Sequence, residues 1–311
     1  MSYRATAFAA VIACAALWGV SGTIAQVLFQ DHVSPVLLAT IRLWGAAVLM
    51  LAAIALRSPS RLRLDRKSIR GLAIFGVFGF FAVQYSYFAA IAAIGVATAT
   101  FLQYLGPALI VIYAAIAGRR LPTGVESLAL LLAVSGTALL VLSAGAGSVT
   151  LPGLAFGLFS AVSLAFYTIY PRALLRALGP WTTSGYGFLF GAAFATAQLL
   201  VMHPTGPLHF SARDLWLIAF VVIVGTLLPF SLYISALRHL TPSEAGIAAT
   251  AEPLAAAAAA FLLLGQALQG WQYLGGVLIV SAVLVLAGFG GRSAAARVEP
   301  SGVTAGGRPD P

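Results

Sequence analysis

Ten apolar segments divide this chain, and each is long enough to cross a lipid bilayer. A membrane-spanning helix needs about 20 apolar residues for a hydrocarbon core of about 30 Å. The chain is 61% hydrophobic and only 8% charged, so it has too few polar side chains to cover a surface in water. It must therefore be dissolved in lipid. The expected spans are 7–28, 36–56, 69–90, 96–117, 124–143, 153–171, 181–202, 214–236, 244–264 and 272–290.

The absence of water in the bilayer restricts the secondary structure of these spans. Backbone groups in lipid must pair within the chain, which leaves helices or the strands of a closed barrel. Barrel strands are about ten residues long and alternate polar with apolar side chains. Segments such as 128–142 and 245–264 do not alternate. The predicted fold class is therefore an all-α integral membrane protein with ten transmembrane helices.

The net charge of +9 is concentrated in one set of alternate loops. If the N-terminus is cytoplasmic, fifteen basic residues lie inside and only Arg213 lies in an outside loop. Because basic loops stay in the cytoplasm, both termini are predicted to be cytoplasmic. Topology thus explains the charge without nucleic acid as a partner. Contact of the basic loop 57–70 with anionic lipid headgroups is the alternative interpretation.

An internal repeat divides the chain into two halves. At an offset of 146 residues, Gly79 matches Gly225, Tyr87 matches Tyr233 and Pro107 matches Pro253. Each half contains five spans, an odd number, so the second half is predicted to be inverted in the membrane relative to the first. Inverted repeats are typical of secondary transporters; duplication without transport is the alternative. The predicted units are an N-terminus at 1–6, repeats at 7–143 and 152–290, and a disordered cytoplasmic tail at 291–311.

Four local motifs match a known family. They are Leu17-Trp18-Gly19 in the first span, Arg42 in the second, 102–107 (LQYLGP) in the fourth and 251–254 (AEPL) in the ninth. With the layout of five plus five spans, the chain resembles the EamA-type carriers of the drug/metabolite transporter superfamily over residues 7–290. It departs from the family after the fourth and ninth spans, where members often carry Glu. Here Arg119-Arg120 and Gln266 stand at those positions.

The resemblance implies a function and a setting. It implies a secondary active transporter that exports small metabolites, such as amino acids or related compounds, by alternating access. Efflux of drugs or cationic compounds is the alternative. The partners would be a small-molecule substrate and the lipid bilayer, and the protein would be a monomer or homodimer. A chain rich in Arg and Ala without Asn fits a GC-rich bacterium, so the bacterial inner membrane is the predicted location.

The two matched prolines are predicted to kink their helices. A proline inside a helix removes one hydrogen bond and clashes with the carbonyl four residues earlier. Pro107 and Pro253 would therefore release the carbonyls of Gln103 and Ala249, which also lie 146 residues apart. Such carbonyls are tolerated in lipid only where they face protein or a wet cavity. We expect the two kinks to line a central site, and kinks that serve packing alone are the alternative.

Glu252 is the acidic residue predicted to lie deepest in the membrane. A carboxylate at that depth is costly and indicates function, either binding of a substrate amine or proton coupling. A structural acid is the alternative. Glu244 is expected to lie in the first turn of the same helix, where an acid suits the helix dipole. Arg42, the basic residue inside a span, is expected to extend outward or to pair structurally. Binding of an amino acid's carboxylate by Arg42, with the amine at Glu252, is the alternative.

Polar and aromatic side chains recur at helical spacing in several spans. Ser160, Ser163, Tyr167 and Tyr170 follow one face of the sixth span, and Thr100, Gln103 and Pro107 are expected to share a face of the fourth. In lipid such stripes face the bundle interior, where they line a cavity or join helices. The predicted substrate-binding residues are Trp18, Gln84, Tyr87, Thr100, Gln103, Tyr104, Ser163, Tyr167, Tyr170, Tyr233 and Glu252.

No enzyme site is predicted. The four histidines, His32, His203, His209 and His239, lie in loops on both sides of the membrane. No metal cluster or Ser-His pair can be assembled from such positions, so neither a metal nor a cofactor is expected. A channel would need a symmetric ring of polar groups, which the sequence does not show. The fifth and tenth spans carry few polar residues and are expected to scaffold the bundle or to form an oligomer face.

Overall fold

The computed structural model describes residues 3–119, 121–143, 149–202, 210–236, 248–249, 251–268 and 270–285. Within these ranges the chain consists of helices and short connections, without a β-strand. Six helical segments are long and apolar enough to cross a membrane, and three shorter apolar helices accompany them. The predicted all-helical membrane fold is confirmed. The tail and Glu244 lie outside the described residues.

The first half of the chain contains the helices α1 to α7. Two of its long helical segments consist of more than one element, because η2 joins α3 to α4 and a turn joins α5 to α6. The elements are α1 (Tyr3–Gln30), α2 (Pro35–Arg57), η1 (Pro59–Leu62), α3 (Arg66–Ile74), η2 (Phe75–Phe81), α4 (Ala82–Ile94), α5 (Val96–Gln103), α6 (Gly106–Ala117) and α7 (Gly124–Ser143).

The second half contains the helices α8 to α14. The non-helical backbone of Gly179 (φ 75°, ψ 166°) interrupts α9, so its membrane part starts where the expected seventh span does. The elements are α8 (Leu151–Ile169), α9 (Arg172–Met202), α10 (Ala212–Val222), η3 (Ile223–Leu227), α11 (Leu228–Ala236), α13 (Ala251–Leu264) and α14 (Trp271–Val285).

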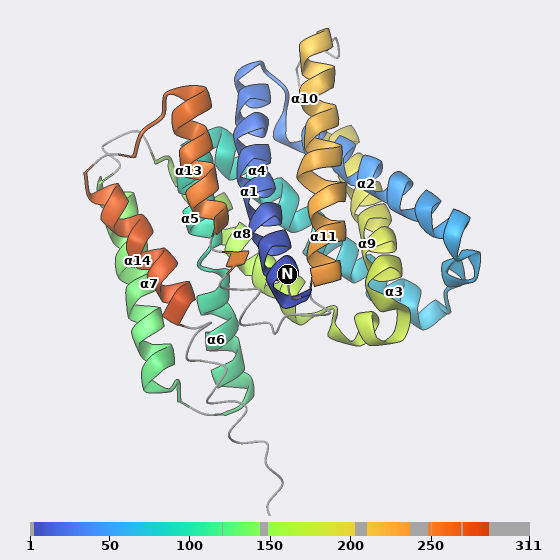
Figure 1. The fold of residues 1–311 in the computed structure, drawn as a ribbon, viewed down its shortest axis with the longest axis horizontal. Helices are drawn as coiled ribbons and strands as arrows, with labels where there is room; N and C mark the ends of the chain where they lie inside the picture. The colour runs from blue at the N-terminus through green and yellow to red at the C-terminus, as the bar shows by residue number, and fades with distance from the viewer. Residues whose placement is uncertain are drawn as a thin grey trace, which may run out of the picture.

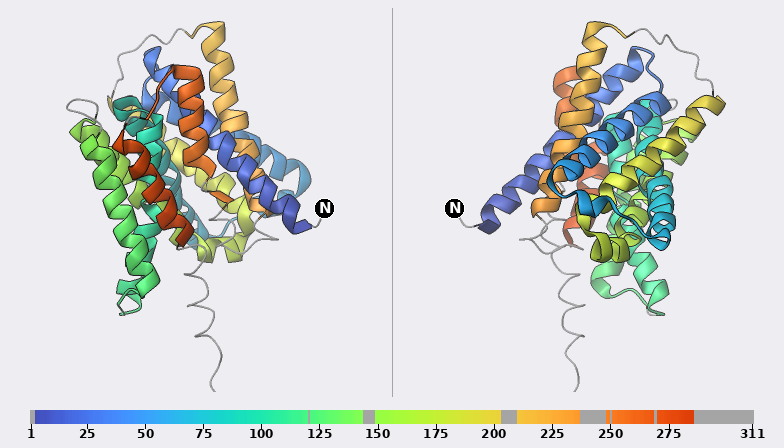
Figure 2. Two further views of the ribbon diagram at one scale, coloured as in Figure 1. Left: turned by 60° about the vertical axis from the view of Figure 1, so that its left-hand side comes forward. Right: turned by 90° about the vertical axis from the view of Figure 1, so that its right-hand side faces the viewer.

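The helices of the two halves interleave. In Figure 1, α1 lies in the middle of the bundle, where it packs on α13, α11 and α10. Its counterpart at the offset of 146 residues is α8, which packs on α4, α5 and α6. Since α4 corresponds to α11 and α6 to α13, the contacts of α8 with α4 and α6 repeat those of α1 with α11 and α13. The helices α7 and α14 pair at one edge, as Figure 2 also shows.

The backbone repeats at the level of single residues. The π-helical segments η2 and η3 overlap when η3 is shifted back by 146 residues. Arg119 and Gly265, also 146 residues apart, both have a left-handed backbone, with φ of 47° and 64°. π-Helical turns are rare and occur often at functional sites. Two in matching positions indicate that the sequence repeat is a structural repeat.

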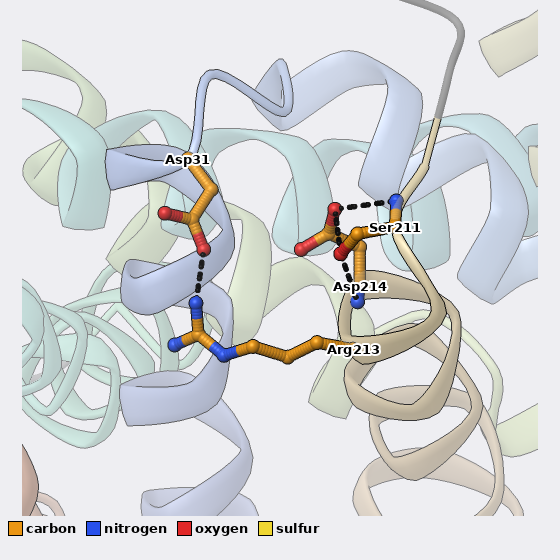
Figure 3. A network of polar contacts seen from close by, with 4 residues as sticks. All are labelled: Asp31, Ser211, Arg213 and Asp214. Atoms are coloured by element: carbon orange, nitrogen blue, oxygen red, sulfur yellow. Dashed lines mark hydrogen bonds and ion pairs between the residues drawn. The ribbon is translucent and has the colours of Figure 1, made fainter.

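A network of polar contacts joins α1 to α10 at one end of the bundle (Figure 3). Ser211 and Asp214 form a capping box at the start of α10, in which each side chain accepts a hydrogen bond from the other's backbone N–H. Arg213, which directly precedes Asp214, donates to Asp31 after α1 at 3.1 Å. Both partners of this ion pair are exposed, so it contributes no more than about 1 kcal/mol. Its effect is to fix which helix ends meet.

The pairing of α7 with α14 depends on glycine. A Cβ added at Gly136 of α7 would lie 2.6 Å from the carbonyl oxygen of Gly275 and 3.0 Å from the backbone nitrogen of Ile279 in α14. Neither backbone atom can move without displacing its helix. Close backbone approach at small residues is how helices associate in lipid. The expected scaffolding role of these two spans therefore has a structural basis.

We predict that Gly136→Ala lowers the stability of the fold. The added methyl group overpacks the interface of α7 with α14, which costs about 1–3 kcal/mol. Gly124→Ala is the matched control, since a Cβ there meets nothing within 4 Å. The measurement is thermal unfolding of the purified variants in detergent. Equal melting temperatures for the two variants would show that the approach at Gly136 does not stabilise the protein.

Candidate functional site

The fourth span is broken near its middle. The helix α5 ends at Gln103, Tyr104 and Leu105 form a turn, and α6 begins at Gly106. Pro107 is thus the second residue of α6, where the missing N–H of a proline has no helical partner to lose. The expectation that Thr100, Gln103 and Pro107 share one helix face was wrong. The break precedes the proline, so Thr100 and Gln103 belong to α5 and Pro107 belongs to α6.

Tyr104, in the turn at this break, reaches across to the other half of the chain. Its hydroxyl lies 2.6 Å from the carbonyl oxygen of Ala249, to which it donates, and 3.1 Å from Oε2 of Glu252. The carbonyl of Ala249 is the one that Pro253 cannot bond, because proline has no N–H. A phenol of the first half therefore satisfies a carbonyl freed in the second. The same contact holds the carboxyl group of Glu252.

Glu252 lies in the first turn of α13, against α1. A Cβ at Gly19 of α1 would lie 2.6 Å from the backbone nitrogen of Ala256 and 2.9 Å from the carbonyl oxygen of Glu252. Glycine is needed there for the two backbones to meet. One residue earlier, the ring of Trp18 lies 5.6 Å from that of Tyr233, tilted by 54°. Glu252, Trp18 and Tyr233 are each only partly buried.

Arg42 turns into the bundle. It is 6% exposed, its Nη2 donates to the carbonyl oxygen of Gly225 at 2.8 Å, and its Nε donates to Oγ1 of Thr226. Both acceptors belong to η3, whose π-helical turn displaces the normal backbone pairing. The guanidinium also lies over the ring of Phe88, 5.3 Å from its centroid. Of the two expected outcomes for Arg42, structural pairing is the one observed.

The charges of Arg42 and Glu252 lie within electrostatic reach of each other. No ion pair joins the two in the part of the chain that the structure describes. Tyr87 lies within reach of both charges, and its hydroxyl shares a hydrogen bond of 2.7 Å with Thr100. Thr100 in turn donates to the carbonyl of Val96. These side chains form one polar centre, built by α1, α2, α4, α5 and α13.

A second group of predicted residues lies in an aromatic cluster. Tyr167 of α8 stacks on Phe75 at 5.5 Å between ring centroids and meets Phe80 edge-on at 5.3 Å. Tyr170 stacks on Phe166 at 4.7 Å. Electrostatic interaction connects Tyr167 to Tyr233, so the cluster adjoins the polar centre. The remaining predicted residues are buried on their helices: Gln84 on α4, Gln103 on α5 and Ser163 on α8.

The two halves carry different chemistry at matching positions. At the offset of 146 residues, Arg42 matches Phe188 and Thr226 matches Phe80. The polar pair of Arg42 with Thr226 therefore corresponds to an aromatic pair, whose ring centroids lie 4.1 Å apart. Glu252 corresponds in the same way to Gly106. The backbone is repeated while the polar groups are asymmetric.

Sequence reasoning missed two contributors. Thr226 anchors Arg42, and Gln26 of α1 accepts a hydrogen bond of 2.7 Å from the backbone N–H of Val96, the first residue of α5. The position of Thr226 next to the matched Gly225 was the available signal for the first. The sequence carries no signal for Gln26 except that it is a polar residue near the end of a span.

Comparisons with known proteins identify the family. The model of the EamA-like transporter family matches residues 5–142 and again residues 151–288. The chain is 33% identical to the uncharacterized inner membrane transporter YicL of Salmonella typhimurium, over 89% of this chain and 93% of the relative. It is 25% identical to the uncharacterized transporter YwfM of Bacillus subtilis, over 89% and 92%.

A relative from Archaeoglobus fulgidus, described as an uncharacterized transporter, is 29% identical over 72% of this chain and 77% of its own. A solved structure, titled only as the crystal structure of a protein, superposes with a TM-score of 0.65 at 21% identity, over 93% of this chain and 99% of the other. It supports the fold alone. The two family matches, one in each half, agree with the repeat seen in the backbone. The chain therefore belongs to the EamA-like transporter family, whose members are membrane transporters and not enzymes.

Proposed function

We propose that this transporter is a secondary active exporter of small metabolites, with amino acids or related compounds as substrates. It would have ten spans in two inverted repeats, with both termini in the cytoplasm of a bacterium. The observation that carries the proposal is the contact of Tyr104 with Glu252 at 3.1 Å. This contact joins the break of the first half to the carboxyl group of the second. Any motion of one repeat against the other must change it.

The arrangement of α6 and α13 supports alternating access. In Figure 1, α6 and α13 run in opposite directions from the middle of the bundle. Discontinuous helices that start near the midplane of inverted repeats are typical substrate sites of secondary transporters. Rocking of the two repeats would open this midplane site first to one side and then to the other.

The asymmetry of the amino ends of α6 and α13 supports a zwitterionic substrate. Glu252 lies in the first turn of α13, whereas no acidic residue lies in the first turn of α6. The carboxylate of Glu252 suits an ammonium group, and the positive dipole end of α6 suits a carboxylate. An amino acid carries both groups. Arg42, held by Gly225 and Thr226, would add a fixed positive charge near the site.

The hydrogen bonds also indicate how a proton would be coupled. Tyr104 has one hydroxyl proton, and its shorter contact is with the carbonyl of Ala249. When Tyr104 donates to that carbonyl, a protonated Glu252 can donate to the phenol oxygen. Loss of the proton would turn Glu252 into an acceptor that competes for Tyr104. Exchange of a proton for a substrate amine at Glu252 is the proposed coupling step.

Efflux of drugs or cationic compounds is the second candidate. It is favoured by the partly exposed rings of Trp18 and Tyr233, 5.6 Å apart and close to Glu252. Aromatic faces attract organic cations, with about 0.5–2 kcal/mol for each contact. A flat cationic compound would bind to Glu252 and to the rings of Trp18 and Tyr233, and it would not use the amino end of α6.

We predict that Glu252→Gln impairs amino-acid exchange by about tenfold or more, or abolishes its dependence on pH, because the amide cannot exchange a proton. The measurement is counterflow of a panel of amino acids and of cationic dyes in proteoliposomes. Glu126→Gln is the matched control, since Glu126 accepts from the backbone of Thr123 at the start of α7, away from the site.

The outcomes of this experiment separate the candidates. Exchange of dyes alone would replace the metabolite exporter with the efflux carrier. If Glu252→Gln exchanged amino acids as fast as the wild type and with the same pH dependence, Glu252 would be a structural acid and the proposed coupling would be wrong.

We predict that Tyr104→Phe slows counterflow severalfold and lowers stability by about 1 kcal/mol, because the partly buried carbonyl of Ala249 loses its hydrogen bond. Tyr273→Phe serves as the control, since Tyr273 of α14 is 56% exposed and its hydroxyl has no hydrogen-bond partner among the residues that the structure describes. Counterflow and thermal unfolding are measured on both variants. Similar losses in the two would mean that the hydroxyl of Tyr104 has no special role.

A further inference from the structure

A hollow of about 720 Å³ lies at the end of the bundle where α1, α4 and α13 finish and α5 and α14 begin. Its polar lining consists mainly of glutamine side chains, and no charged side chain is among the described residues that line it. We refer to it as the glutamine hollow, defined by Gln26, Gln30, Thr98, Gln266 and Gln272.

The amino end of α5 opens into the glutamine hollow. The first four N–H groups of a helix have no partner within the helix. Here Gly95 donates to Ile91 at 2.9 Å and Val96 donates to Gln26 at 2.7 Å. The N–H groups of Ala97 and Thr98 have no partner in the part of the chain that is described, and both residues line the hollow. No acidic residue lies in the first turn of α5 to neutralise its dipole.

Two buried side chains add donors at the same place. Thr98 is 8% exposed, and its hydroxyl has no hydrogen-bond partner among the described residues. Gln26 is 6% exposed. Because its Oε1 accepts from Val96, its Nε2 is the donor left to face the hollow. A Cβ built on Gly95 would lie 3.8 Å and 3.9 Å from the two amide atoms of Gln26, and 3.7 Å from Oε1 of Gln266. Gln266 thus supplies an acceptor beside these donors.

We propose that the glutamine hollow is a binding site for the carboxylate group of a small molecule. The carboxylate would accept hydrogen bonds from the N–H groups of Ala97 and Thr98, the hydroxyl of Thr98 and Nε2 of Gln26. For an amino acid, the ammonium group would face Oε1 of Gln266. Phosphate is disfavoured because none of the described residues that line the hollow is an Arg or Lys that could neutralise a second charge. The proposal rests on the proposed function in one respect, since the ligand is taken to be the transported molecule.

The hollow is separate from the site at Glu252 but lies on the same helices. Ala257 lines the hollow and follows Glu252 by five residues along α13, a rise of about 7.5 Å. Between the two sites, a Cβ on Gly22 of α1 would lie 2.9 Å from the hydroxyl of Tyr87 and 2.9 Å from a methyl group of Val96. This close packing closes the path between them. A substrate would therefore occupy the hollow before or after the central site.

The test is direct binding to the full chain in lipid nanodiscs, with propionate, alanine and ethylamine as radiolabelled probes. We expect propionate and alanine to bind and ethylamine not to bind at the hollow. Gln26→Glu should raise the Kd for propionate by about tenfold or more, because it places a negative charge beside the carboxylate and still offers an acceptor to Val96. Thr98→Val should raise it by about threefold, as expected for one lost hydrogen bond.

Gln30→Glu is the control for charge, because Gln30 lines the same hollow at an exposed position away from the amino end of α5. It should change the Kd for propionate by less than about twofold at physiological salt. Equal effects of Gln26→Glu and Gln30→Glu, or absence of propionate binding in the wild type, would overturn the proposal.

Counterflow of amino acids, measured in parallel, distinguishes this proposal from the proposed function. Propionate binding that Gln26→Glu weakens, in a protein that exchanges no amino acid, would support the site and refute amino-acid transport. Amino-acid exchange that depends on Glu252, together with propionate binding that Gln26→Glu leaves unchanged, would support the transport function and refute the site.

Discussion

A helix in lipid can be interrupted only where something inside the protein accepts the backbone groups that the interruption frees. The structure meets this constraint with two side chains that cross between the halves. Tyr104 bonds the carbonyl of Ala249, which Pro253 leaves without a helical donor, and Arg42 bonds the carbonyl of Gly225 in a π-helical turn. Both long side chains come from the first half and serve the second. The side chains that bond the freed backbone groups therefore also hold the two halves together.

Function in such a molecule depends on the difference between the halves. The backbone repeats down to single φ angles and π-helical turns. The side chains at corresponding positions differ, however. Two phenylalanines of the other half correspond to Arg42 and Thr226, and a glycine corresponds to Glu252. A repeated backbone would allow two conformations of similar energy, as the proposed alternating access needs. The asymmetric groups give the site one arrangement of charge, which substrate recognition requires.

Much of this could be predicted from the sequence, because the signals were strong and local. Hydropathy predicted the helices, and the match of Pro107 with Pro253 predicted interruptions whose freed carbonyl at Ala249 the structure shows bonded. The π-helical turns could not be predicted, since nothing in their apolar sequence distinguishes them from α-helix. For the same reason structural pairing of Arg42 could be expected but its partners could not, because the acceptors exist only where the turn displaces the backbone. The break at Tyr104 precedes the proline, so reading the fourth span as one continuous helix placed its polar face incorrectly.

The central claim is that a substrate binds against the carboxyl group of Glu252. Carbodiimides modify protonated carboxyl groups in apolar surroundings, so labelling of Glu252 by dicyclohexylcarbodiimide can be followed by mass spectrometry of its peptide. The account predicts that Glu252 is labelled and that transported amino acids slow its labelling, while the labelling of Glu126 stays the same. Labelling of Glu252 that no transported substrate slows would contradict the account.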